Sequence, residues 1–137
     1  MREIVADTSA LYALIDADDL HHAEAVDFLR GELDEITLIV LETTLFETIT
    51  LTKSRLGHPV AAKALHSIET SPRMRVARLT AEQSAQTWAF FDQYADKAWS
   101  PFDCACLAFA QAHGIREAFA FDRHFEQMAG AGLIRLP

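Results

Sequence analysis

The chain has 137 residues, half of them apolar, and a formal net charge of −8. A chain of this length fits one domain that closes a single hydrophobic core. The negative charge excludes a protein that coats nucleic acid by electrostatic attraction alone. It does not exclude an enzyme that acts on nucleic acid through bound cations, because a cation neutralises the carboxylates that hold it.

The sequence is typical of a cytoplasmic protein. It contains no apolar run of about 20 residues that would span a bilayer, and its N-terminus lacks the pattern of a secretory leader. The cysteines, Cys104 and Cys106, are too close together to staple distant segments, and no second pair suggests a zinc site. We interpret them as reduced thiols that pack as small residues.

The first element is a short apolar run, Ile4–Ala6, that ends on Asp7. Thr8 and Ser9 then lead into a helix predicted over Ser9–Ala17. This pattern is typical of a buried strand whose last residue meets a helix N-terminus. In open α/β sheets ligands bind at that edge. An Asp in this place is also a common helix cap, so Asp7 alone does not define a site.

The rest of the chain alternates between strand and helix patterns. Strands are predicted over Thr37–Leu41, Met74–Leu79, Glu117–Phe121 and Leu133–Leu136. Helices are predicted over His21–Leu33, Glu42–Leu56, Pro59 to Ser71, Thr80 to Ala95 and Ser100 to Gly114, with a short helical turn after Asp122. Such alternation predicts an α/β fold, a mainly parallel sheet with helices on both faces.

Two of these segments carry residues that favour more than one interpretation. The β-branched residues of Glu42–Leu56 favour a strand, but the spacing of its leucines and isoleucine and the stop at Gly57 favour a helix. Its polar stripe consists of Thr43, Glu47, Thr50 and Ser54. The strand Met74–Leu79 carries arginines at positions 73, 75 and 78 in or beside it, which favours an edge of the sheet. A path for RNA would explain these arginines equally well.

Four acids are predicted to meet at one edge. Asp7 and Asp122 both end strands, and parallel strands point their carboxyl ends the same way. The helix that begins at Ser100 runs through a short connection into the fourth strand, so its first turn, with Asp103, lies at that edge too. Glu47 lies near the start of the helix after the second strand. Each acid alone could be a cap or a solvated residue, but their convergence indicates a shared site.

Clustered carboxylates repel one another and have raised pKa values unless cations are present. Oxygen ligands of this kind suit Mg²⁺ or Mn²⁺ and not zinc. The chemistry that uses such a cluster is metal-assisted phosphoryl transfer, in which a metal lowers the pKa of a water and steadies the reacting oxygens. No arrangement of His, Cys or Ser competes as a nucleophile.

Four segments resemble, in order, the motifs of PIN-domain ribonucleases, and in particular the VapC-type toxins of bacterial toxin–antitoxin pairs. They are DTSALYAL at Asp7–Leu14, ETITL at Glu47–Leu51, FDCACLAFA at Phe102–Ala110 and FDRHF at Phe121–Phe125. The resemblance spans essentially the whole chain. It implies one three-layer α/β/α PIN domain over residues 1–137, with a five-stranded, mainly parallel sheet. The implied activity is that of a hydrolase, an Mg²⁺- or Mn²⁺-dependent endoribonuclease.

The resemblance also implies a set of site residues and partners. The catalytic and metal-binding acids are Asp7, Glu47, Asp103 and Asp122, the same set that the topology indicates. Ser9 and Ser100 match small hydroxyl positions that help to orient the site. The implied partners are an RNA substrate, a second copy of the chain in a homodimer, and a small VapB-like antitoxin whose tail occupies the acidic groove.

Two positions depart from the family pattern. Phe102 replaces a Thr that is frequent before the third acid, which removes one hydroxyl. His124 stands where some PIN domains have a further acid, which leaves open whether the site binds one metal or two. We interpret His124 as a surface residue and Arg123 as the better contact for an RNA phosphate. The aromatic residues Trp88, Phe91, Trp99 and Phe109 have the spacing of core and interface packing.

Other classes fit less well. A receiver-like domain needs a Lys after a late strand, and no Lys follows Lys97. A haloacid-dehalogenase-type phosphatase needs a second Asp two residues after the first, and Ser9 stands there instead. The remaining alternative is a PIN-like module that binds RNA or a partner without cutting. A missing acid would indicate that module, and none is missing.

Overall fold

A computed structural model describes residues 1–32 and 35–137. Its centre is a five-stranded sheet with the order β3-β2-β1-β4-β5, in which every neighbouring pair is parallel. The strands are β1 (Arg2–Ala6), β2 (Ile36–Leu41), β3 (Met74–Ala77), β4 (Glu117–Phe119) and β5 (Ile134–Leu136). The predicted parallel α/β sheet is therefore confirmed, and the first strand lies at its centre.

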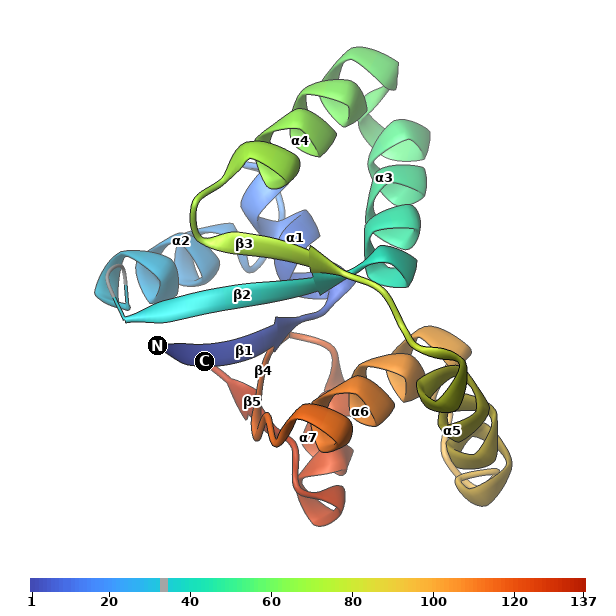
Figure 1. The fold of residues 1–137 in the computed structure, drawn as a ribbon. Helices are drawn as coiled ribbons and strands as arrows, with labels where there is room; N and C mark the ends of the chain where they lie inside the picture. Colours follow the sequence, from blue (N-terminus) through green and yellow to red (C-terminus); the bar gives the residue numbers. More distant parts are fainter. Residues whose placement is uncertain (33–34) are drawn as a thin grey trace.

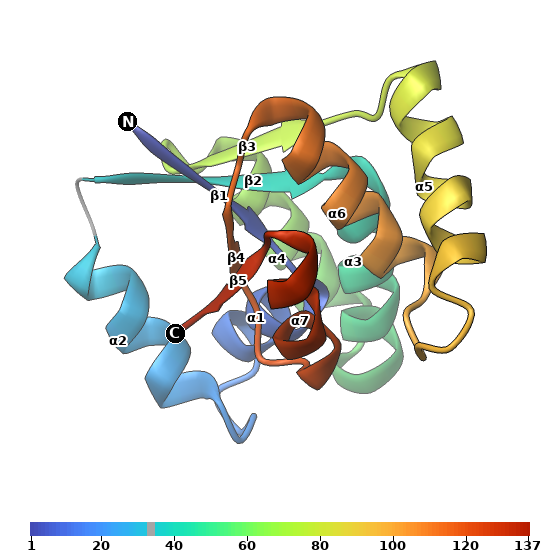
Figure 2. The ribbon, with the colours of Figure 1, turned by 90° about the horizontal axis from the view of Figure 1, so that it is seen from below.

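Helices cover both faces of this sheet. They are α1 (Thr8–Ile15), α2 (His22–Gly31), α3 (Glu42–Leu56), α4 (His58–Thr70), α5 (Ala81–Gln93), α6 (Pro101–His113) and α7 (Arg123–Gln127), with a 3₁₀ turn, η1, over Met128–Ala131. Figure 1 shows α1 to α4 on one side of the sheet and α5 to α7 on the other. Figure 2 shows α5 at the side of the molecule, outside α6. The architecture is the expected three-layer α/β/α arrangement.

Alternation along the central strand separates two hydrophobic cores. Ile4 and Ala6 face the core under α1, α2 and α4, whereas Val5 faces the core under α6. This follows from the two-residue period of a β-strand. Strands buried on both faces read as continuous apolar runs, as β1 and β2 do here. The helix α6 is buried from Asp103 to Ala110, including the free cysteines Cys104 and Cys106, which confirms their packing role.

The strand order creates a crevice beside β1. The chain passes from β1 outward to β2 and β3, then crosses back to β4, which pairs with β1 through Val5 and Ala118 and through Ala6 and Phe119. The connections after β1 and β4 therefore leave the sheet in different directions. Ligands of open α/β sheets bind outside the carboxyl ends of the strands at such a point. Asp7 follows one of these strands, and Asp122 lies shortly after the other.

The predicted helices and strands are present, but several begin or end at other residues than predicted. The helix predicted over Ser9–Ala17 spans Thr8–Ile15, and the helix predicted over His21–Leu33 is described over His22–Gly31, since Leu33 lies outside the described residues. The strand predicted over Glu117–Phe121 ends at Phe119. The reason is that the backbone N–H of Phe121 donates to Ser9 Oγ instead of continuing the ladder.

Gly57 joins α3 directly to α4. It caps the end of one helix and precedes the other with a φ of 91°, a conformation that residues with a Cβ rarely adopt. The stop at Gly57 and the helical assignment of Glu42–Leu56 are therefore confirmed. The strand β3 likewise lies at a sheet edge, as its arginines indicate, and it is shorter than the predicted Met74–Leu79.

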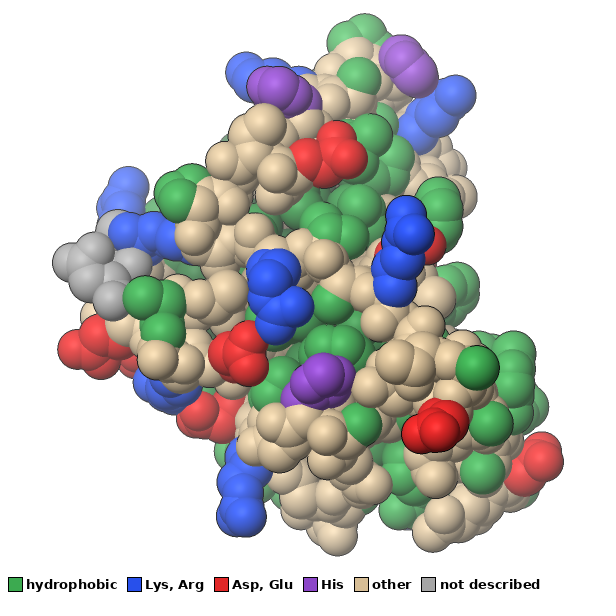
Figure 3. Space-filling view, in the orientation of Figure 1, with side chains coloured by type: hydrophobic (Ala, Val, Ile, Leu, Met, Phe, Trp, Pro, Cys, Tyr) green, Lys and Arg blue, Asp and Glu red, His purple; other side chains and the backbone are tan. Residues whose placement is uncertain are grey.

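The surface near β3 carries paired charges. Arg75 pairs with Glu3 at 2.7 Å and Arg78 with Glu42 at 3.0 Å. On the face shown in Figure 3, cationic and acidic side chains are interspersed among hydrophobic ones, without a continuous basic band among the described residues. Across the part of the chain that the structure describes, every helix is too short or too polar to cross a bilayer.

The four aromatic residues singled out in the sequence divide into two pairs. Trp99 and Phe109 are buried in the core under α6, as predicted. Trp88 and Phe91 lie on α5 with 56% and 42% of their surface exposed. Their position on an outer helix leaves them available for packing against another molecule.

Candidate active site

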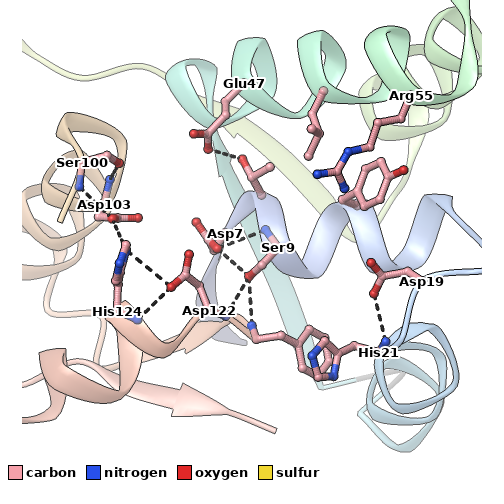
Figure 4. A pocket seen from close by; sticks show the side chains of 14 residues that line it. Asp7, Ser9, Asp19, His21, Glu47, Arg55, Ser100, Asp103, Asp122 and His124 are labelled. Carbon is pink, nitrogen blue, oxygen red and sulfur yellow. Dashed lines mark hydrogen bonds and ion pairs between the residues drawn. The ribbon is translucent and has the colours of Figure 1, made fainter. Parts of the chain in front are cut away.

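A cavity of about 560 Å³ opens at the carboxyl edge of the sheet, between β1 and β4. It is lined by all four predicted acids and both predicted serines: Asp7, Glu47, Asp103, Asp122, Ser9 and Ser100. These residues come from the start of α1, from α3, from the start of α6 and from the β4–α7 connection. The convergence expected from topology is present (Figure 4).

Asp7 is both a helix cap and a cavity residue. Its carboxylate accepts hydrogen bonds from the backbone N–H of Ser9 at 3.0 Å and from Ser9 Oγ at 2.6 Å, and it caps α1. The side chain is 5% exposed. Burial, helped by the charges of Asp103 and Asp122, raises the pKa of Asp7 to about 7 against the lowering effect of the hydrogen bonds from Ser9.

Ser9 connects the two sides of the crevice. Its Oγ donates to Asp7 and accepts the backbone N–H groups of Phe121 at 2.9 Å and Asp122 at 3.2 Å. One hydroxyl therefore holds the first acid and the chain segment that carries the fourth.

Asp103 is positioned by a reciprocal cap at the start of α6. Its backbone N–H donates to Ser100 Oγ at 3.2 Å, and the backbone N–H of Ser100 donates to Asp103 Oδ2 at 2.9 Å, a capping box. Burial raises the pKa of Asp103, whereas the hydrogen bonds from Ser100 and His124 lower it. The side chain that completes the capping box of α6 therefore also lines the cavity.

His124 lies between two of the acids, contrary to its interpretation as a surface residue. Its Nδ1 is 2.9 Å from Asp103 Oδ2 and 3.4 Å from Asp122 Oδ1, and its backbone N–H donates to Asp122 Oδ1 at 2.8 Å. Asp122 thereby caps α7. The imidazole faces the cavity (Figure 4). The interpretation was wrong because His124 lies in the first turn of α7, where its ring meets Asp103 of α6, a contact that sequence spacing does not indicate.

Glu47 reaches the cavity from α3. Thr8 Oγ1 donates to Glu47 Oε1, and Thr48 Oγ1 donates to Thr8 Oγ1 at 3.1 Å. Burial raises the pKa of Glu47 against the hydrogen bond from Thr8, and the charges of Asp103 and Asp122 raise it too. This chain of two hydroxyl groups fixes the carboxylate toward Asp7.

Of the polar stripe predicted on this helix, only Glu47 lines the cavity, and Thr50 and Ser54 lie on the exposed surface. The residues of α3 that line the cavity are Glu47, Leu51 and Arg55. They are four residues apart and therefore share one face of the helix. Thr50 is exposed and donates to the carbonyl of Phe46 instead. Polarity alone does not show which side of a half-buried helix meets a neighbouring loop, so the stripe does not identify Leu51 and Arg55 as cavity residues.

Several cavity residues had no assigned role in the sequence. Arg55, Tyr12, Asp19, His21 and Phe121 line its far end. Spacing alone could have found Arg55, because it lies two turns after Glu47 on the same helix. No local pattern identifies His21. Of the other predicted positions, neither Arg123 nor Phe102 lines the cavity, and both side chains are at least partly exposed.

The donor set fits a hard divalent cation. Among the residues that the structure describes, no three His, Cys, Asp or Glu side chains are already gathered at ligand geometry. Nonetheless Asp7, Glu47 and Asp103 share a cavity in which burial raises the pKa of each. A bound cation would favour their charged forms. Carboxylate oxygens are the ligands that Mg²⁺ and Mn²⁺ take.

Comparison with known proteins identifies similar chains. The model of the PIN domain family matches residues 4–131. Over 133 residues the chain is 31% identical to VapC20 of Mycobacterium tuberculosis, named as a 23S rRNA-specific endonuclease, and the match covers 97% of each protein.

Solved structures agree with the sequence comparison. The crystal structure of Mycobacterium tuberculosis VapC20, titled a sarcin–ricin loop cleaving toxin, superimposes with a TM-score of 0.83 at 30% identity, over 96% of each chain. VapBC2 from Rickettsia felis, solved with a promoter DNA fragment, gives a TM-score of 0.73 at 12% identity, over 98% of this chain and 97% of that one. The second likeness shows the fold alone.

Proposed function

The chain belongs to the PIN-domain family, and we propose that it is a VapC-type toxin that cleaves RNA with a bound Mg²⁺ or Mn²⁺ ion. The observation that carries this proposal is the convergence of four carboxylates from four separate elements on one cavity. The family match spans most of the chain and includes every one of these acids. The alternative, a PIN-like module that binds without cutting, is disfavoured because all four acids face the same space.

Each acid has a partner that sets its direction. Asp7, Glu47, Asp103 and Asp122 would hold the cation. When bound, it supplies a water of lowered pKa and stabilises charge on the phosphate oxygens. Ser9 orients Asp7, Ser100 orients Asp103, and Thr8 orients Glu47.

His124 adds a nitrogen donor that holds Asp103 and Asp122 in one arrangement. Preorganised groups of this kind avoid the cost of reorganisation during the reaction. The same hydrogen bond keeps the carboxylate of Asp103 from rotating away from the cavity. These contacts support a site whose acids could close around a cation beside a phosphodiester.

The substrate proposal follows from the curated relative. VapC20 is named as a 23S rRNA-specific endonuclease, and its crystal structure is titled as that of a sarcin–ricin loop cleaving toxin. We propose that this chain acts on RNA of the same class, a structured loop of ribosomal RNA, and therefore acts in the cytoplasm. Arg123, exposed at the start of α7 beside Asp122, would contact a phosphate outside the cavity.

The proposed protein partners are a cognate VapB-like antitoxin and a second copy of the chain. An acidic cavity of this size would accept a basic side chain from the antitoxin tail. The exposed Trp88 and Phe91 on α5, with Phe102 at the start of α6, support a homodimer contact, because aromatic side chains are enriched at interfaces.

Induced expression tests the proposed function. Wild type, Asp7→Asn and the matched control Asp92→Asn, an exposed acid on α5, are expressed separately, and RNA ends are mapped in each culture. We expect growth arrest with new RNA ends for wild type and Asp92→Asn, and neither for Asp7→Asn produced at the same level. Equal arrest by Asp7→Asn, or arrest without RNA cleavage, would contradict the proposal.

A further inference from the structure

The cavity has a second end that the metal chemistry does not use. Away from Asp103 it is lined by Tyr12, Asp19, His21, Arg55 and Phe121. Figure 4 labels Asp19, His21 and Arg55 at this end. These residues come from α1, from the loop before α2, from the last turn of α3 and from the segment after β4. The acidic end and this aromatic and basic end share one continuous space.

Arg55 supplies the positive charge of this end. It is the one Lys or Arg among the described residues that line the cavity. Its guanidinium lies over the ring of Tyr12, 5.1 Å from the centroid, and the hydroxyl of Tyr12 donates to Asp16 at 2.7 Å. A guanidinium supported by an aromatic face keeps its N–H donors directed outward in a fixed plane.

Arg55 also differs from several arginines of the surface. Arg2, Arg75, Arg78 and Arg135 each form an ion pair with a glutamate. Within the described part of the chain, Arg55 has no carboxylate at ion-pairing distance. Its charge does act on the nearby Asp16, because the hydrogen bond from Tyr12 lowers the pKa of Asp16 and the charge of Arg55 lowers it further. Without a direct ion pair, the guanidinium can still bind an anion that enters the cavity.

His21 and Phe121 form a flat aromatic surface nearby. Their rings stack with centroids 4.5 Å apart and planes 5° apart, and both side chains remain partly exposed. The backbone N–H of His21 is held by Asp19 at 2.9 Å, and that of Phe121 is held by Ser9 Oγ at 2.9 Å. The hydroxyl that orients Asp7 therefore also positions this aromatic pair.

We propose that Arg55 and the His21–Phe121 stack form a nucleotide subsite, in which Arg55 binds the phosphate next to the cleaved one and the stack binds a base. Single-stranded RNA is bound in this way, by cations along its backbone and aromatic rings against its bases. A cation is needed here because the protein is acidic and the catalytic metal neutralises only the other end. This inference rests on the proposed RNA cleavage. It adds the path of the RNA, which would run from the four acids toward Arg55 and the His21–Phe121 stack.

RNA binding without cleavage tests the subsite. The substitutions are placed in Asp7→Asn protein with Mn²⁺, and binding of a fluorescent single-stranded RNA is followed by anisotropy over a range of salt concentrations. Arg55→Met should weaken binding about tenfold at low salt and reduce the slope of log K against log salt by about 0.7, the value for one lost phosphate contact. Arg55→Lys should keep the slope.

Matched variants separate the subsite from general effects. Lys53→Met removes an exposed charge from the same helix outside the cavity and should change neither affinity nor slope. His21→Ala should weaken RNA binding about tenfold without changing the salt slope. His21→Phe, which keeps an aromatic ring, should bind RNA with the affinity of the protein that has His21. Thermal unfolding is measured for each variant, with Arg55→Gln as the replacement if Arg55→Met does not fold.

The outcomes distinguish the two proposals. If wild type cleaves RNA but Arg55→Met and Arg55→Gln bind with unchanged affinity and slope, the subsite is refuted and the nuclease stands. An equal loss of binding in Lys53→Met would also overturn it, because the effect would then be one of overall charge. If wild type neither binds nor cleaves RNA, the proposed function fails and the subsite fails with it.

Discussion

Nδ1 of His124 lies 2.9 Å from Oδ2 of Asp103, and this contact joins α7 to α6 across the mouth of the cavity. It places a ring nitrogen between the carboxylates of Asp103 and Asp122. Because Asp103 also accepts a hydrogen bond from the backbone of Ser100, its carboxylate has two fixed partners. The direction of a proposed metal ligand is thus set by residues from two elements.

Removal of this contact should weaken cation binding. Groups that orient metal ligands typically contribute 10- to 100-fold to metal affinity. We expect His124→Ala to raise the dissociation constant for Mn²⁺ about tenfold, measured by isothermal titration calorimetry. His66→Ala, an exposed histidine on α4, is the control. An unchanged affinity in His124→Ala would mean that the imidazole does not orient Asp103.

Stability without metal should fall as the pH rises through the range in which Asp7 titrates. The pKa of Asp7 is raised from 3.8 to about 7 in the folded protein, so the unfolded chain loses this proton first. Between about pH 4 and pH 7 the folded state therefore binds more protons, and the free energy of unfolding decreases with pH by up to about 4 kcal/mol.

Urea denaturation in EDTA at several pH values measures this effect. Asp7→Asn should remove most of the decrease, whereas Asp92→Asn should retain it. Added Mg²⁺ should raise stability most at the high-pH end, where the carboxylates are charged. A free energy of unfolding that is flat between pH 4 and pH 7 in wild type would show that Asp7 is not held in this environment.

Ser9→Ala should destabilise the fold and the site together. It leaves the backbone N–H groups of Phe121 and Asp122 without their acceptor and removes a donor from Asp7. Unsatisfied buried groups cost about 1–3 kcal/mol each. We expect a loss of about 2 kcal/mol in urea denaturation, while Ser67→Ala, at an exposed position on α4, should change stability little. Equal stability of the two variants would contradict the linking role of Ser9.

The acids could be found from sequence because strand direction decides where they lie. An alternating strand and helix pattern places every strand end at the same edge, so Asp7 and Asp122 converge whatever the details of packing. The cap at Ser100 and the short connection into β4 then bring Asp103 to that edge. Glu47 could be placed at that edge because it lies near the start of the helix that follows the second strand. Each of these inferences depends on local patterns and on the parallel sheet.

The rest of the cavity depends on contacts between distant loops. His21 meets Phe121 only when the loop before α2 lies beside the end of β4, and Arg55 meets Tyr12 only when α3 packs on α1. Neither pairing follows from spacing along the chain. His124 was misjudged for the same reason. Helical spacing from Glu47 places Arg55 on the cavity side of α3, but no local pattern shows which residues of other elements His21, Arg55 and His124 will contact.

Cleavage of RNA by the purified protein tests the central claim most directly. Wild type is incubated with ribosomal RNA that contains the sarcin–ricin loop, in Mn²⁺, in EDTA, and in EDTA followed by excess Mn²⁺, beside Asp103→Asn and Asp92→Asn. We predict cleavage at defined positions that EDTA abolishes and Mn²⁺ restores, and that falls at least about 100-fold in Asp103→Asn but persists in Asp92→Asn. Cleavage that continues in EDTA, or that survives intact in Asp103→Asn, would contradict the account.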